Sequence, residues 1–150
     1  MASAFQIILM ELCILEKKSK KYYSKIRKLT PYPALAKALD KKHTGIDAHI
    51  KRLNLIITSY KGKEKKAAPL QPTLPPIPTK DTDDAVHDLR IISSVQQVIQ
   101  QKMIYYRLLS KMAATKDTPD LSMLFKYAIL ENQGTSARLD ALVLRLFSDE

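Results

Sequence analysis

The sequence is poor in the residues that build tight turns, disulfide-bonded folds and aromatic cores. Its 150 residues include no Trp, three Gly and one Cys. No segment alternates apolar and polar residues between turn-forming residues, as a half-buried strand does. Leu, Ala, Lys and Gln, which lose little rotamer freedom in a helix, are frequent instead. The sequence therefore predicts an all-α protein, and its length fits a single domain spanning residues 1–150.

The chain also lacks the features of secreted and membrane proteins. Cys13 has no second cysteine with which to form a disulfide within the chain, and we interpret it as a small buried apolar side chain. The apolar run over residues 5–15 has no basic residue before it and contains Glu11, so it does not resemble a signal peptide. No stretch approaches the roughly 18–20 apolar residues of a membrane span. We therefore expect a cytoplasmic protein with no transmembrane segment.

Positive charge is concentrated in the first half of the sequence. Residues 1–66 contain 16 Lys and Arg against 5 acidic residues, a net charge of +11, whereas residues 67–150 contain 9 against 10, or −1. A basic half of this kind either keeps a helix face solvated or binds nucleic acid or another acidic partner. No motif of a known nucleic-acid-binding module accompanies it.

Apolar residues recur at alternating spacings of three and four, the pattern of helices packed in a bundle. A segment at 62–80 interrupts this pattern and holds five of the eight prolines, so it cannot be helical. Extended at about 3.1 Å per residue, it is long enough to run along a helix of the bundle as a crossover strap. The sequence predicts two antiparallel hairpins joined by this strap, with helices at 3–29, 33–61, 82–116 and 119–148.

The two predicted hairpins carry an internal repeat. The pair Tyr22-Tyr23 recurs 83 residues later as Tyr105-Tyr106. A second set recurs 86 residues later: Pro33, Arg52 and Leu53 correspond to Pro119, Arg138 and Leu139. The three-residue difference falls in the hairpin turn, where a change in length is tolerated best. Two hairpins joined by one long crossover is a common wiring of a four-helix bundle.

On these residues the chain resembles the ferritin-like superfamily. The segments Ile104-Tyr105-Tyr106-Arg107-Leu108-Leu109 and Leu124-Phe125-Lys126-Tyr127-Ala128 are similar to a rubrerythrin-type hairpin. The first half, from Leu15-Glu16-Lys17-Lys18 to His49-Ile50-Lys51-Arg52-Leu53, is similar to bacterial stress-associated ferritin-like proteins. The resemblance implies an antiparallel four-helix bundle, and it covers nearly the whole chain outside the strap.

The resemblance also implies a degenerate two-metal site. In that family each hairpin supplies one Glu from its first helix and a Glu-x-x-His pair from its second. At the corresponding places the first hairpin has Glu16, Ile46 and His49, and the second has Ile99, Asn132 and Thr135. Ile46 and Ile99 thus replace ligands, and the two remaining ligands, Glu16 and His49, cannot hold two irons.

We expect the remaining polar residues to form a core cluster of Glu16, His49, Asn132 and Thr135, with Glu16 and His49 paired and no cofactor bound. The residues that recur at spacings of three and four on each predicted helix form a stripe that faces the core. Lys102 falls on this inward stripe in the helix at 82–116 and is a further candidate partner for Glu16. Lys42 falls on the stripe of the helix at 33–61 but lies nearer the helix end. The alternative is a single weakly bound divalent ion held by Glu16 and His49, with Asn132 as a further ligand. His43 and His87 are expected at the surface.

The sequence contains no recognisable catalytic motif, and we expect no conventional enzymatic activity. Our first hypothesis is a non-catalytic ferritin-like protein, stress-associated or an interaction module, and dimeric. The second is a residual metal-binding protein that handles iron or manganese. The third is a basic bundle that binds nucleic acid through its N-terminal half.

Overall fold

The computed structural model describes residues 3–59, 69–115 and 118–148. Within these ranges it contains helices and no strand, so the all-α prediction is confirmed. The helices are α1 (Ala4–Arg27), α2 (Pro33–Ala38), α3 (Lys41–Thr44), α4 (Ile46–Ser59), α5 (Asp84–Thr115) and α6 (Pro119–Ser148). The first helix begins at a capping box, in which the Ser3 hydroxyl accepts from Gln6 N and the Gln6 side chain accepts from Ser3 N.

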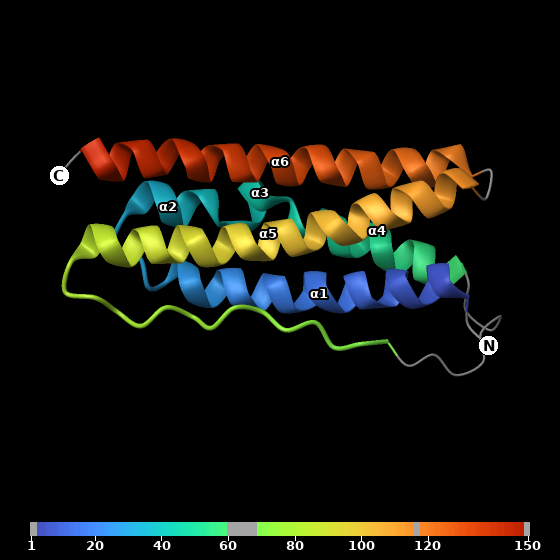
Figure 1. Cartoon of the computed structure of the whole chain (residues 1–150), viewed down its shortest axis with the longest axis horizontal. Helices are drawn as coiled ribbons and strands as arrows, with labels where there is room; N and C mark the ends of the chain where they lie inside the picture. Colours follow the sequence, from blue (N-terminus) through green and yellow to red (C-terminus); the bar gives the residue numbers. More distant parts are fainter. Residues whose placement is uncertain (1–2, 60–68, 116–117, 149–150) are drawn as a thin grey trace.

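The continuous helix predicted at 33–61 is wrong, because the chain breaks there into α2, α3 and α4 (Figure 1). The first piece ends at Ala38 with Leu39 as its C-cap, and Asp40 starts the second, since its carboxylate accepts a hydrogen bond from His43 N at 2.8 Å. Gly45 then ends α3 in the left-handed conformation, with a φ of 66°. The break turns Lys42, expected on the inward stripe, out to solvent. Residues 60 and 61 of the predicted helix lie outside the described residues.

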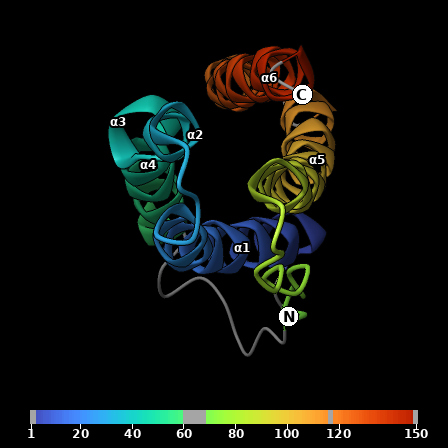
Figure 2. The same ribbon diagram turned by 90° about the vertical axis from the view of Figure 1, so that its left-hand side faces the viewer.

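The long helices pack as two antiparallel pairs (Figures 1 and 2). The first helix, α1, packs against α4 and α5, and α5 packs along the length of α6. The short helices α2 and α3 lie against α6 and thereby cover part of the remaining side. Seen along the long axis, α6 lies opposite α1, with α5 on one side and α2–α4 on the other (Figure 2).

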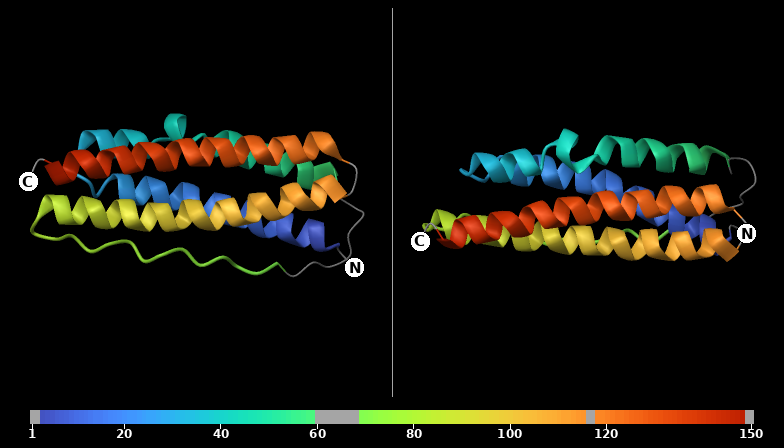
Figure 3. Two further views of the ribbon diagram at one scale, coloured as in Figure 1. Left: turned by 45° about the horizontal axis from the view of Figure 1, so that its top comes forward. Right: turned by 90° about the horizontal axis from the view of Figure 1, so that it is seen from above.

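The described part of the proline-rich strap, residues 69–80, is extended and runs beside α1 (Figures 1 and 3). Lys18 Nζ donates to the Pro72 carbonyl oxygen at 2.9 Å, which fixes the strap to α1. Leu74 packs against the core of the bundle. The strap therefore contributes to packing as well as connecting the hairpins; its predicted residues 62–68 lie outside the described residues.

The core consists of two apolar clusters with polar residues between them. One cluster includes Tyr23, Ile46, Ile99 and Leu139, and the other includes Leu12, Leu53, Tyr106 and Phe125. Along α1, α4, α5 and α6 alike, buried polar residues lie where one cluster gives way to the other: Glu16 and Ser19, His49, Lys102, and Asn132 and Thr135. A polar layer thus crosses the middle of the bundle.

Candidate functional site

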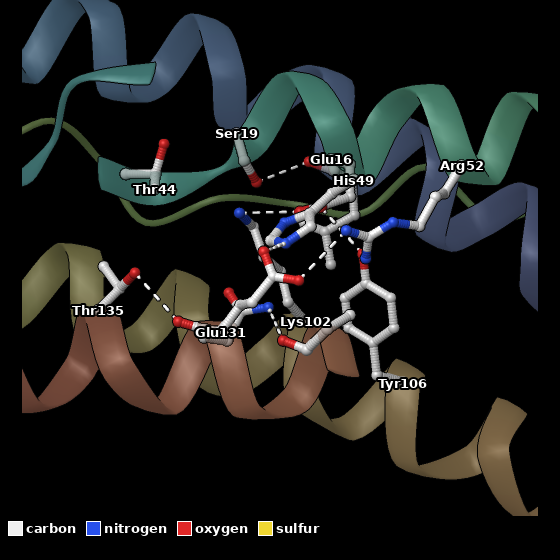
Figure 4. Close-up of polar contacts among 12 residues, drawn as sticks. Glu16, Ser19, Thr44, His49, Arg52, Lys102, Tyr106, Glu131 and Thr135 are labelled. Atoms are coloured by element: carbon white, nitrogen blue, oxygen red, sulfur yellow. Dashed lines mark hydrogen bonds and ion pairs between the residues drawn. The ribbon is translucent and has the colours of Figure 1, made fainter. Parts of the chain in front are cut away.

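Ionisable side chains from three helices meet in this polar layer. Glu16 comes from α1, His49 from α4 and Lys102 from α5, and all three are fully buried. Figure 4 shows them turned toward one another. A buried charge is costly unless it is paired, so the contacts of each group determine what the layer can do.

Glu16 is the centre of the cluster. Its Oε1 lies 2.8 Å from Lys102 Nζ, and its Oε2 accepts a hydrogen bond from the Tyr106 hydroxyl at 3.0 Å. His49 Nδ1 approaches Oε2 to 3.3 Å in an electrostatic contact that is not aligned as a hydrogen bond. Burial alone would raise the pKa of Glu16, but Lys102 and His49 together lower it to about 2. Glu16 is therefore an anion at neutral pH.

Lys102 is held as a cation by the same contacts. Its Nζ donates to the Tyr23 hydroxyl at 3.1 Å and lies 4.6 Å from the centre of the Tyr23 ring. Burial would lower the pKa of Lys102, yet the adjacent Glu16 carboxylate keeps it above the usual value. Tyr23 and Tyr106, which are related by the sequence repeat, thus bind the two members of one buried ion pair.

The cluster continues to the surface through Glu131, which the sequence analysis missed. His49 Nε2 lies 3.0 Å from Glu131 Oε2, and Arg52 Nη2 donates to Glu131 Oε1 at 3.2 Å. Glu131 lies off the inward stripe of α6 and is partly exposed, so helical periodicity does not select it. Its position next to Asn132 was the available signal, because a Glu side chain is long enough to reach inward from that level.

The remaining predicted residues are buried but do not join the charged cluster. Asn132 Nδ2 donates to the Ala128 carbonyl at 2.8 Å, and the Thr135 hydroxyl donates to the Glu131 carbonyl at 3.3 Å. Both bonds remain within α6. Ile46 and Ile99 place hydrocarbon in the neighbouring apolar cluster. The structure therefore brings Glu16 and His49 together, and it leaves Asn132 and Thr135 bonded to their own helix.

The carboxylates around His49 lie on two sides of its imidazole ring. Glu16 and Glu131 contact opposite nitrogens of the imidazole ring, so the three side chains do not converge on one point. Among the residues that the structure describes, no group of three or more His, Cys, Asp or Glu side chains is placed to hold a metal. The Lys102 ammonium also stands beside Glu16, where it repels a second cation.

A small hollow borders the cluster on the Arg52 side. It is lined by His49, Arg52, Leu53, Tyr106 and Phe125, among others, and its volume is about 10 Å³. Such a volume accommodates about one water molecule. This hollow therefore cannot admit an organic substrate to His49.

The other two histidines differ from one another. His43 is half-buried and its Nδ1 lies 2.8 Å from Asp40 Oδ1. His87 is fully buried, and its Nε2 lies 3.2 Å from the Leu29 carbonyl oxygen. The expectation that His87 lies at the surface is wrong, because its ring packs between the start of α5 and the turn after α1.

Lysines line an open groove along α1. The groove has a volume of about 610 Å³ and lies between α1 and the segment formed by α3 and α4. Its lining includes Lys17, Lys20, Lys21, Lys25 and Lys41. One of them is neutralised within the chain, since Lys20 Nζ lies 2.6 Å from Asp47 Oδ1. Five lysines of the first half thus line one concave surface.

Comparison with protein families, curated proteins and solved structures finds no match to this chain. None of the helices in the described ranges combines the length and apolarity needed to cross a membrane.

Proposed function

We propose that this protein is a non-catalytic, ferritin-like helical scaffold that acts through its surface. In this proposal the Lys102 ammonium supplies the positive charge that metal ions supply in the ferritin-like family. The observation that carries the proposal is the fully buried contact of 2.8 Å between Lys102 Nζ and Glu16 Oε1. Because the cation is covalently part of the chain, the site holds no exchangeable ion with which to do redox chemistry.

The course of the chain supports the ferritin-like part of the proposal. Two antiparallel hairpins joined by one long crossover is the wiring of ferritin-like folds, and α1 with α4, the strap, and α5 with α6 follow that order. Glu16 and His49 occupy the positions that the sequence resemblance assigns to retained ligands. The resemblance thus accounts for why a charged layer lies in the middle of an otherwise apolar core.

Metal analysis tests the proposal. Protein purified from cells supplied with iron and manganese is assayed for metal per chain, alongside His49→Ala. We expect far less than one ion per chain in both proteins. One iron or manganese ion per chain, lost in His49→Ala, would replace this proposal with the residual metal-binding function.

A second candidate function, binding of nucleic acid, is favoured by the lysine groove along α1. Neutralising phosphates with lysines releases counterions, so affinity must fall steeply as salt rises. We expect the double variant Lys17→Gln/Lys21→Gln to weaken binding of duplex DNA and to reduce its salt dependence. The matched control is Arg107→Gln/Lys111→Gln, which removes the same charge from exposed positions on α5. No binding at low salt, or equal loss in both variants, would remove this candidate.

A further inference from the structure

The outward face of α6 carries large apolar side chains that are exposed in the part of the chain that the structure describes. Met123, Tyr127, Leu130 and Leu144 are 47%, 53%, 61% and 73% exposed. Figure 2 shows α6 at the edge of the bundle, with its outer side turned away from the other helices that the structure describes. A contiguous exposed apolar surface on one helix is typical of a protein–protein interface.

These residues form a regular seam with its own heptad spacing. Starting at Met123, the spacing of four and three residues passes through Tyr127, Leu130, Gly134, Ala137, Ala141 and Leu144. None of these residues is charged. All of them except Met123, which follows the partly buried Leu121, lie two residues after a buried position of α6, such as Phe125 before Tyr127 or Leu142 before Leu144. At about 100° per residue, that offset places the seam on the side opposite the core.

The middle of the seam permits close approach of another backbone. A Cβ added at Gly134 would meet open space, with nothing within 4 Å. A glycine inside a helix is less favourable than alanine, and no contact among the residues that the structure describes requires this one. Ala137 and Ala141 continue the small-residue centre of the seam. The small centre, between larger residues at both ends, suits a second helix laid against α6.

A second copy of α6 running in the opposite direction fits this seam in size. When Gly134 faces Ala137 of the second copy, Leu130 faces Ala141 and Tyr127 faces Leu144. Large side chains then meet small ones next to the centre. A parallel copy would instead place Leu130 against Leu130 and leave Gly134 facing Gly134. The antiparallel register therefore fills space more evenly.

The charges beside the seam also fit an antiparallel copy. On one side of the seam Lys126 lies toward the start of α6 and Asp140 toward its end. On the other side Glu131 lies toward the start and Arg145 toward the end. An antiparallel pair brings like sides together in reversed order, so the side that carries Lys126 and Asp140 faces the same side of the second copy, and the side that carries Glu131 and Arg145 does likewise. Opposite charges at such flanking positions select partner and orientation.

We propose that the outward face of α6 is a homodimer interface, in which two copies of this chain pack α6 against α6 in antiparallel orientation about Gly134 and Ala137. This inference does not depend on the metal-free polar layer: the apolar seam residues lie outside the charged cluster, and only Glu131, which flanks the seam, also belongs to that cluster. It names the partner that an interaction scaffold would bind through this face.

Sedimentation equilibrium across a wide range of protein concentration tests the interface. We expect a mass twice that of the 17.0 kDa chain, and we expect Leu130→Glu to shift the protein to monomer while its helical circular dichroism is unchanged. The matched control is Leu55→Glu, an equally exposed leucine on α4, which should remain dimeric. A wild-type monomer at all concentrations, or equal dissociation of both variants, would overturn the proposal.

Cross-linking tests the orientation. Leu130→Cys and Ala141→Cys proteins are oxidised separately and as an equimolar mixture. The antiparallel register places residue 130 beside residue 141 of the second copy, so the mixture should form disulfide-linked dimers well in excess of either protein alone. Efficient cross-linking of each protein with itself would indicate a parallel pair and contradict the proposed register.

Discussion

The two helical hairpins share a sequence repeat, but they contribute opposite charges to the buried ion pair of Glu16 and Lys102. The first hairpin has Glu16 and Ser19 on the inward face of α1, and the second has Ile99 and Lys102 at the positions 83 residues later. The same offset relates Tyr23 to Tyr106. Glu16 has one partner within its own hairpin, His49, and a second on the other hairpin, Lys102. The ion pair with Lys102 therefore joins one hairpin to the other.

Outside the core the hairpins differ again. The outer surface of α1 is lined with lysines, including Lys17, Lys21 and Lys25, whereas the outer seam of α6 has no charge and exposes Leu130 and Leu144. A lysine surface attracts an anionic partner, and an apolar heptad seam packs against another helix. One chain thus presents two faces suited to different partners, with a charged layer inside that holds its halves together.

The largest expected effect comes from removing Lys102, the member of the buried ion pair that the second hairpin supplies. Lys102→Met should lower the free energy of unfolding by about 3–5 kcal/mol, because it leaves Glu16 buried without its cation. Urea denaturation measures the loss. The control Lys111→Met, at an exposed position on the same helix, should change stability by no more than about 0.5 kcal/mol. Similar losses in both variants would contradict a special role for Lys102.

Acid should lower the stability of the folded protein, because it protonates Glu16 on the first hairpin. The pKa of Glu16 is about 2 in the folded protein against a usual 4.5, so its contribution is fully present above pH 4.5 and is lost as the pH falls toward 2. The difference corresponds to about 3 kcal/mol. Denaturation at several pH values should show this loss in the wild type. A Glu16→Gln/Lys102→Met variant should lack that part of the pH dependence, and an unchanged profile would contradict it.

The repeated tyrosines provide a smaller test. Tyr106→Phe removes the hydroxyl that donates to Glu16 and should cost about 1.5–3 kcal/mol, the usual contribution of a hydrogen bond to a charged group. Tyr127→Phe is the matched control, since Tyr127 is about half exposed and its substitution should be nearly neutral in a monomeric Leu130→Glu background. Equal effects in that background would argue against the Tyr106 bond as a contributor to stability.

The smallest expected effects come from Gly45 and Gly134, which both lie inside helices predicted from the sequence. Replacing each by alanine should change stability in opposite directions. Gly45→Ala should destabilise by about 1–2 kcal/mol, because Gly45 is left-handed and its new Cβ would lie 3.1 Å from Glu131 Oε2. Gly134→Ala, in the monomeric Leu130→Glu background, should stabilise by up to about 1 kcal/mol. Thermal unfolding of both variants measures the difference, and a shift of the same sign in both would contradict this assignment.

Helical periodicity predicts the long elements well, because apolar residues at spacings of three and four mark a buried face along α1, α5 and α6. It fails at residues 39–45, where apolar spacing continues across a break. The competing signals were local: Asp40 caps the following turn, and Gly45 adopts the left-handed conformation that ends it. The spacing of apolar side chains carries no information about capping or about a left-handed backbone, so it could not predict this break.

The candidate site was predictable only along the inward stripes. Glu16, His49 and Lys102 lie on those stripes, and the structure places them in contact. Glu131 lies off its stripe and enters through the length of its side chain, which periodicity ignores. Asn132 lies on the stripe but bonds to its own helix, as amide side chains near backbone carbonyls often do.

A double-mutant cycle on Glu16 and Lys102 examines whether a lysine, rather than a metal, balances the buried carboxylate. Unfolding free energies are compared for Glu16→Gln, Lys102→Met and the double variant, all in metal-free buffer containing a chelator. We predict that the double variant loses at least about 2 kcal/mol less than the sum of the two single losses, because each single change strands the other charge. Additive losses would show that Glu16 and Lys102 do not stabilise one another and would contradict this account of the polar layer.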